Sequence, residues 1–341
     1  MMIIINASYG ICAPFLPHLS DEHDVDQSYL GIMFCAYSIS MAIMSPISGK
    51  FQYSLGRRNV VQYGLFIVGL PFLGFYFINL MSRTSTSFIL LFILMRVIQG
   101  IGTSMSQTSI YSILTYSYPE HVSLVVGCIE GSAGIGLCIG PLIGTLTYKI
   151  GGLNAPFLTF FIVLTLFSLI VKYVIPKEAD KTDKSTISTK DISYTKLLMN
   201  SRIIFANMSV FFAQFQLTFI DPVLANYLHT IFDINYEDSG YFFLVICLGY
   251  TISSTLVHLS TKFVSNRHLC MIASIGLGLF TMMYAPSYIL HLPSNEYLVL
   301  FALLLTGITG AQLIITPMDE MIEVGQQVMN LDSNNNALND V

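Results

Sequence analysis

The amino-acid sequence predicts an all-α polytopic membrane protein, and three observations lead to that fold class. Charged residues make up only 10% of the 341-residue chain, against about 25% in a soluble globular protein. The hydrophobic residue types AVILMFWYC reach 54%, and the mean hydropathy is +0.67. These apolar residues are grouped in repeated segments close to the roughly 20 residues that a helix needs to cross a bilayer.

Ten apolar spans can be assigned along the chain. The first is short and contains Asn6, Pro14 and Pro17. It lacks the cationic start and the small-residue cleavage site of a signal peptide, so a membrane helix is the preferred interpretation. The spans are expected at residues 2–19, 29–48, 59–80, 88–112, 123–147, 155–175, 203–226, 239–258, 269–289 and 297–318.

Lysine and arginine are distributed unevenly between the two sides of this predicted bundle. The loops after the second, sixth and eighth spans hold twelve of them, and the opposite loops hold only Arg83 and Lys149. Because positive residues favour the cytoplasmic side, the amino terminus is predicted to be cytoplasmic. The twelve residues are Lys50, Arg57, Arg58, Lys172, Lys177, Lys181, Lys184, Lys190, Lys196, Arg202, Lys262 and Arg267.

A polar segment rich in Ser, Thr and Lys separates the first six spans from the last four. A central linker of this kind is typical of transporters built from two pseudo-symmetric halves, which rock around a site at the bilayer midplane. The expected domains are an N-terminal six-helix half at 1–175, a cytoplasmic linker at 176–202, a partial C-terminal half of four helices at 203–318 and a polar tail at 319–341.

Composition argues against several functional classes. The net charge is −5, and the chain has no basic stripe that would bind nucleic acid. Its six cysteines lie inside apolar segments without a CxxC pair, and its seven histidines lie in loops or near span ends. A disulfide framework, a metal site or a catalytic triad is therefore not expected. We predict that the chain is not an enzyme and holds no cofactor.

The stretch VVGCIEGSAGIGLCIGPLIGTL, residues 125–146, is rich in glycine and allows two interpretations. A dinucleotide-binding turn needs a strand before its glycines and a helix with a polar face after them, and neither is indicated here. Gly136, Gly140 and Gly144 are instead spaced four apart, so they share one helix face and allow a second helix to approach closely. Pro141 removes one backbone donor and can kink the helix.

Three strongly ionisable residues lie inside the predicted spans and away from their ends: Arg96, Glu130 and Asp221. Each costs about 2.5–3.5 kcal/mol at a helix centre on insertion scales, so each is expected to face a cavity or a partner. With two carboxylates and one guanidinium, one acid has no built-in counter-charge and could either bind a cation or take up a proton. Because these two states exclude each other, the set predicts proton/cation exchange.

Structural alternatives exist for these charged residues. Arg96 could serve only to join helices through backbone carbonyls. Asp221 precedes Pro222 and could cap a helix that restarts after a break. Glu130 lies about seven residues into its span, deeper than simple snorkelling permits, which favours a functional role.

Amide side chains inside or near the spans are candidates for lining a cavity. They carry both donors and acceptors, so each could bind a ligand or join two helices. The candidates are Asn6, Gln99, Gln216 and Gln312.

The glycine pattern of the fifth span resembles a known family motif. Gly127-x8-Gly136-x3-Gly140-Pro141-x2-Gly144 is similar to the antiporter motif in the fifth helix of the major facilitator superfamily. Thr145 stands where that motif has its last glycine.

Two further stretches resemble the same family. RVIQGIG, residues 96–102, is similar to its fourth-helix motif. GKFQYSLGRR resembles the loop motif after its second helix, through Gly49, Gly56, Arg57 and Arg58. The resemblance implies a major-facilitator-type bundle of two six-helix halves, with about 10 of 12 transmembrane helices present here.

A narrower resemblance covers most of the chain. LVVGCIEGSAGIGLCIGPLIG, FIDPVLANYL and GAQLIITPMDEMIE resemble helices 5, 7 and 10 of the vesicular amine and polyamine transporters. This implies proton-driven exchange of an organic cation. The first-helix acid of the monoamine members is not evident here, where Asn6 lies nearby, and another acid position of that group, around Gln312, is neutral. The polyamine-like branch therefore fits better. Members have two further helices, so the chain is expected to be truncated after helix 10.

These observations predict a secondary active transporter in the lipid bilayer, a proton-coupled antiporter of a small organic cation. The resemblance implies a vesicular or endomembrane location, and the plasma membrane is the alternative. Glu130 is the expected proton/cation carboxylate, Arg96 its electrostatic modulator and Asp221 a second candidate cation site. The alternatives are a drug- or sugar-like facilitator on the same scaffold, or a non-transporting truncated relic that binds a membrane partner.

Overall fold

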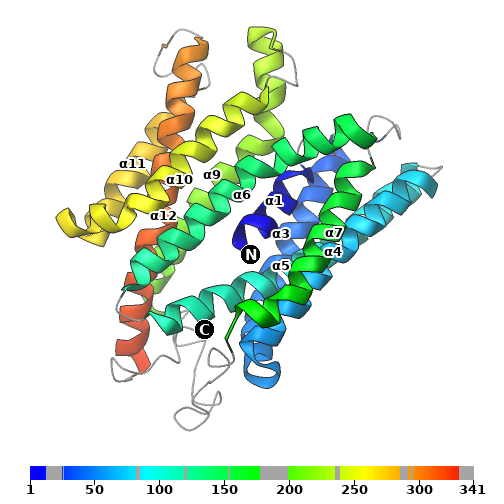
Figure 1. Ribbon diagram of the computed structural model, residues 1–341. Helices are drawn as coiled ribbons and strands as arrows, with labels where there is room; N and C mark the ends of the chain where they lie inside the picture. The colour runs from blue at the N-terminus through cyan, green and yellow to red at the C-terminus, as the bar shows by residue number, and fades with distance from the viewer. Residues whose placement is uncertain are drawn as a thin grey trace. The chain divides into compact units, whose positions relative to one another are not determined.

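All ten ordered elements in the described part of the chain are α-helices (Figure 1). The computed structural model describes residues 1–12, 25, 27–81, 85–118, 121–152, 154–176, 199–234, 239–284, 291–292 and 295–329. The helices are α1 (Met2–Gly10), α3 (Gln27–Leu55), α4 (Arg57–Met81), α5 (Ser85–Ser117), α6 (Val122–Gly151), α7 (Ala155–Val174), α9 (Ser201–Phe232), α10 (Ser239–Phe263), α11 (Asn266–Tyr284) and α12 (Glu296–Met329).

Nine of the helices within these ranges are long and apolar enough to cross a membrane. Large apolar side chains also lie on the outside: Phe205, Phe212 and Phe215 on α9 are 75%, 58% and 59% exposed. Such a surface suits lipid rather than water, and helices satisfy their backbone hydrogen bonds internally, as lipid requires. The predicted class of all-α polytopic membrane protein is confirmed.

The helices follow the predicted spans and differ from them mainly at the ends. The span expected at 2–19 is described as a helix only over Met2–Gly10, and residues 13–20 lie outside the described ranges. α12 continues to Met329, so it extends into the segment 319–341 that the sequence predicted as a polar tail. Most of the linker expected at 176–202 also lies outside the described ranges.

The helices form two compact units. The first contains α1, α3, α4, α5, α7 and the part of α6 from Ile139 onward. The second contains α6 up to Cys138, together with α9, α10, α11 and α12. The long helix α6 therefore contributes to both units, and the division of the chain into halves at 1–175 and 203–318 stays a prediction.

An aromatic core holds the first unit together. Phe75 of α4 stacks on Phe92 of α5 with ring centroids 4.3 Å apart, and Phe72 of α4 stacks on Phe160 of α7 at 5.8 Å. All four side chains are at most 3% exposed. Such pairs contribute about 0.5–1.5 kcal/mol beyond their buried area, so they fix α4 between α5 and α7.

Glycines allow α5 to lie close to its neighbours in the first unit. A Cβ added at Gly102 would lie 2.6 Å from the Val68 amide nitrogen and 2.8 Å from the Gly64 carbonyl oxygen, both on α4. A Cβ at Gly100 would overlap Ser40 on α3. Small residues are the usual means of close helix packing in a bilayer, and here they hold the helix that carries Arg96.

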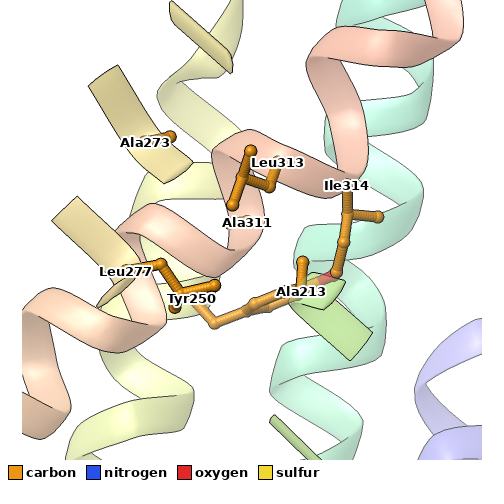
Figure 2. Packing of buried hydrophobic residues seen from close by; sticks show 7 residues of the cluster. All are labelled: Ala213, Tyr250, Ala273, Leu277, Ala311, Leu313 and Ile314. Carbon is orange, nitrogen blue, oxygen red and sulfur yellow. The ribbon is translucent and has the colours of Figure 1, made fainter. Parts of the chain in front are cut away.

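Alanines, larger aliphatic residues and one tyrosine form a buried cluster in the second unit (Figure 2). Glycines also bring α10 and α12 together. A Cβ at Gly307 of α12 would overlap the Ile246 carbonyl of α10, and a Cβ at Gly249 of α10 would overlap the Leu304 carbonyl of α12. The cluster joins α9, α10, α11 and α12 through Ala213, Tyr250, Ala273, Leu277, Ala311, Leu313 and Ile314.

Candidate functional site

α6 packs on α10 in the second unit through a glycine face. A Cβ at Gly127 would lie 2.5 Å from the Ser254 carbonyl oxygen, and one at Gly131 would lie 2.8 Å from Thr255 Oγ1. A Cβ at Gly134 would overlap Thr251 Oγ1. These glycines recur at i, i+4 and i+7, which places them on one side of the helix, so the backbone of α6 approaches α10 along about two turns.

Glu130 lies beside this glycine face and receives a hydrogen bond from α10. The Tyr250 hydroxyl donates to Glu130 Oε2. The Tyr250 side chain is buried, with 8% exposure, in the cluster of Figure 2, while the Glu130 side chain is half-buried. The aromatic ring of Tyr250 therefore packs against residues of α9, α11 and α12, while its hydroxyl group donates to the Glu130 carboxylate of α6.

A second polar contact joins α10 to α12. Gln312 Nε2 donates to Ser253 Oγ at 3.0 Å, and Ser253 Oγ donates to the Ile308 carbonyl at 2.9 Å. Gln312 Oε1 is buried, and among the described residues it has no hydrogen-bond partner. Gln216 makes a comparable link between α9 and α11, donating to the Tyr284 hydroxyl at 2.5 Å. Both glutamines thus join helices in the second unit.

Arg96 lies in the first unit and is fully buried, with 0% exposure. Its Nη1 donates to Gln99 Oε1 at 2.8 Å, and its Nε donates to the Met33 carbonyl at 3.4 Å. Gln99 Nε2 in turn donates to the Ser8 carbonyl at 3.5 Å. The Arg96–Gln99 pair therefore links α5 to α3 and to α1.

Three aromatic rings surround the Arg96 guanidinium. Its Cζ lies 5.6 Å from the ring centroid of Tyr9, 5.2 Å from that of Phe34 and 5.1 Å from that of Tyr37. Each contact of this kind stabilises a cation by about 0.5–2 kcal/mol, most when water is excluded. The rings thus compensate part of the cost of burying the charge. Within the described residues, Arg96 Nη2 has no hydrogen-bond partner.

The structure does not place the predicted partners Arg96 and Glu130 in one unit. Arg96 belongs to the first unit and Glu130 to the second, so their electrostatic pairing stays a prediction. Asn6 is half-buried on α1 and donates to the Met2 carbonyl of its own helix at 3.0 Å.

The alternative in which a helix restarts at Asp221 is wrong. α9 is continuous from Ser201 to Phe232 and passes through Asp221 and Pro222 without a break. An N-cap requires a helix terminus, and Asp221 lies within the helix. The side chains of these two residues lie outside the described part of the structure, so a role for Asp221 as a cation site stays a prediction.

The predicted glycine face of α6 is buried but differs from the face that touches α10. Gly136, Gly140 and Gly144 are all buried, and a Cβ at Gly140 would overlap the Ala7 carbonyl of α1 in the first unit. Pro141 lies within α6, which continues to Gly151.

The loop motif forms a tight turn between α3 and α4. Gly56 has φ +83°, a conformation that glycine adopts at little cost, and its amide nitrogen donates to the Gln52 carbonyl at 3.0 Å. Arg57, at 2% exposure, lies over the Tyr116 ring with Cζ 4.5 Å from the centroid. Gly49 is buried and Arg58 half-buried. The motif thus connects the turn to α5.

Sequence reasoning missed Tyr250, Gly131 and the rings around Arg96. The spacing of Gly127, Gly131 and Gly134 was visible and would have indicated a second glycine face. Tyr250 had only the weak signal of a phenol inside an apolar span. Over the part of the chain that the structure describes, no three His, Cys, Asp or Glu side chains gather as a metal site would require.

Comparison with known families identifies the architecture. A profile described as the Major Facilitator Superfamily matches residues 1–323. The chain belongs to that family. The mouse (Mus musculus) MFS-type transporter SLC18B1 is 27% identical over 319 residues, which cover 92% of this chain and 68% of that protein. The human synaptic vesicular amine transporter is 24% identical over 241 residues, covering 70% of this chain and 45% of that protein.

Solved structures agree on the fold. The human organic anion transporter MFSD10 superposes with a TM-score of 0.68 at 16% identity, covering 99% of this chain and 88% of that one. The proton:xylose symporter XylE superposes with a TM-score of 0.70 at 12% identity, covering 99% of this chain and 83% of that one. These similarities confirm the major-facilitator fold and the resemblance to the vesicular amine transporter branch. The chain is an integral multi-pass transporter of small molecules and, as predicted, not an enzyme.

Replacement of Arg96 by lysine tests whether the guanidinium joins helices. Lysine keeps the charge but cannot donate to Gln99 and Met33 while lying among three rings. We expect Arg96→Lys to lower the free energy of unfolding by about 1–3 kcal/mol, the cost of buried groups left without partners, measured by thermal unfolding in detergent. Arg202→Lys, at an exposed position on α9, is the control. Unchanged stability with lost transport would instead assign Arg96 a functional role.

Proposed function

We propose that the chain exchanges protons for a small organic cation and that Glu130 is the carboxylate shared by the two. The observation that carries this proposal is the hydrogen bond from Tyr250 to Glu130, made where the glycine face of α6 lies against α10. An ionisable side chain inside a membrane helix is costly and is most often part of a substrate or proton pathway.

The chemistry of the pair suits exchange. Glu130 is half-buried and accepts a hydrogen bond from the neutral Tyr250 phenol. A bound ammonium group or a bound proton can each neutralise its carboxylate. Because one carboxylate cannot hold both, binding of one ligand promotes release of the other. This exclusion is the simplest form of coupled antiport.

The substrate class is inferred from relatives and from charge. The human synaptic vesicular amine transporter, at 24% identity, is named for amines, which are cations at neutral pH. A half-buried carboxylate with a phenol donor is suited to an ammonium group, which supplies several N–H donors. We therefore favour an amine or a polyamine.

The second candidate function is facilitated transport of a neutral or anionic solute. The similar folds of a proton:xylose symporter and an organic anion transporter motivate it. A carboxylate at the substrate site would repel an anion, and a sugar needs no counter-charge. Uptake of an amine rather than of a sugar or an anion, together with dependence on Glu130, separates these possibilities.

Proton-driven uptake into proteoliposomes tests the proposed role of Glu130. We expect labelled spermidine to accumulate when a proton gradient is imposed, and uptake by Glu130→Gln to fall to the background of empty liposomes, because the amide cannot bind a proton or neutralise a cation. Glu296→Gln, an equivalent change at an exposed position on α12, should transport normally. Gradient-driven uptake that survives in Glu130→Gln would refute this role.

The sidedness of the chain is a further part of the proposal. The twelve-to-two bias of Lys and Arg supports a cytoplasmic amino terminus and linker. In a variant whose native cysteines are replaced by serine, Ser185→Cys in the linker should react with an impermeant maleimide only from the cytoplasmic side. Asp24→Cys, in the acidic stretch DEHDVD between the first two predicted spans, should react only from the opposite side, and the reverse pattern would overturn the assignment.

A further inference from the structure

Two cysteines meet across the contact between α6 and α10. Cys138 of α6 lies within side-chain hydrogen-bonding reach of Cys247 of α10. Both are thiols that form no disulfide in the structure, and both are half-buried. They belong to the second unit, so their contact is part of its packing.

The register of the two helices places these thiols together independently. Gly127 lies against Ser254, and Gly134 lies against Thr251. Residue numbers along the contact therefore rise on α6 while they fall on α10. Cys138 follows Gly134 by four residues, and Cys247 precedes Thr251 by four. One more turn of each helix, about 5.4 Å along its axis, therefore brings Cys138 opposite Cys247.

The glycine face also brings the two helix backbones close together. A disulfide requires Cα atoms roughly 4.4–6.8 Å apart and Cβ atoms about 3.5–4.5 Å apart. Between bulky helix faces this spacing is rarely reached, but here a Cβ at Gly134 would already overlap Thr251 Oγ1 one turn away.

The other cysteines differ from this pair. Cys12 donates to the Ser8 carbonyl at 3.9 Å within α1, and Cys270 contacts Thr316 Oγ1 at 2.8 Å. Cys35 and Cys128 are exposed on α3 and α6. Cys138 and Cys247, in contrast, lie within hydrogen-bonding reach of each other.

We propose that Cys138 and Cys247 form a reversible disulfide that cross-links α6 to α10. A hydroperoxide is the oxidant: the first thiol sulfur takes one peroxide oxygen as a sulfenic acid and releases water or an alcohol. The second thiol sulfur then attacks the sulfenic sulfur, and the departing hydroxide leaves as water with that thiol's proton. Two thiols lose two electrons, and the peroxide oxygen–oxygen bond accepts them. A dithiol reductant reverses the change by exchange.

The consequence for transport rests on the proposed function. The structure places both cysteines in the second unit, whereas the predicted division of the chain places Cys138 in the N-terminal half and Cys247 in the C-terminal half. Under that predicted division, alternating access moves the two halves against each other, so a covalent bond that keeps α6 packed on α10 would arrest exchange. The bond would form about two turns from Glu130 along α6 and about one turn from Tyr250 along α10, making the pair an oxidation-sensitive switch on that site.

A cleavable linker provides a readout that does not depend on transport. A protease site placed in segment 176–202 of the full-length chain separates Cys138 from Cys247 on cleavage. After treatment with hydrogen peroxide and cleavage, we expect most of the protein to run as one joined species on a non-reducing gel and as two fragments after dithiothreitol. Cys128→Ser, a change at an exposed position on the same helix, should behave like the parent chain.

Cys138→Ser and Cys247→Ser decide the assignment. We expect both variants to separate into two fragments under oxidising conditions. Fragments that stay joined in either variant, or that separate in the oxidised parent chain, would overturn the proposal. Spermidine uptake by the parent chain should fall in proportion to the joined fraction and recover on reduction. Absence of uptake even from the reduced chain would count against the proposed transport function, while the gel still decides on the disulfide.

Discussion

The close approach of α6 to α10 is the contact on which the proposed chemistry depends. Gly127, Gly131 and Gly134 remove the side chains that would hold the two backbones apart. In lipid, where apolar burial gives little advantage to helix association, such close packing and interhelical hydrogen bonds supply much of the attraction. The approach lets the Tyr250 phenol reach Glu130. It also brings Cys138 to Cys247.

Two ionisable side chains, Arg96 and Glu130, are accommodated by different means in the two units. Arg96 is surrounded by rings and is tied through Gln99 and a backbone carbonyl to two other helices. Glu130 is only half-buried and has a neutral phenol as a donor. A fully enclosed cation that joins three helices suits a fixed structural role, because moving it would expose several buried polar groups at once. A carboxylate beside a neutral donor can change its protonation state with less disturbance.

Sequence patterns predicted the fold well because they report on the bilayer directly. Runs of about 20 apolar residues and the distribution of Lys and Arg reflect the thickness and sidedness of the membrane. The motifs around Arg96 and Gly136 then indicated the family. The positions of helix ends were less certain, as α12 shows by continuing to Met329, because a helix can extend beyond the apolar stretch that crosses the membrane.

The candidate site was only partly predictable, for a physical reason. The cost of a charge in lipid indicated Glu130 and Arg96 as individual residues. Their neighbours depend on how helices distant in sequence pack together: Tyr250 is 120 residues from Glu130, and Phe34 lies on α3 while Arg96 lies on α5. No local periodicity encodes such a pairing. At Asp221 the local sequence was misleading: the proline that follows it suggested a possible helix break, but α9 is continuous there.

A double-mutant cycle on Glu130 and Tyr250 tests the central contact most directly. The free energy of unfolding in one detergent would be measured for the parent chain, Glu130→Gln, Tyr250→Phe and the double variant. A real hydrogen bond between the two side chains predicts a coupling free energy of about 0.6–3 kcal/mol, between the average for membrane helices and the range for charged groups. Strictly additive effects of the two substitutions would show that the residues do not interact and would contradict the account.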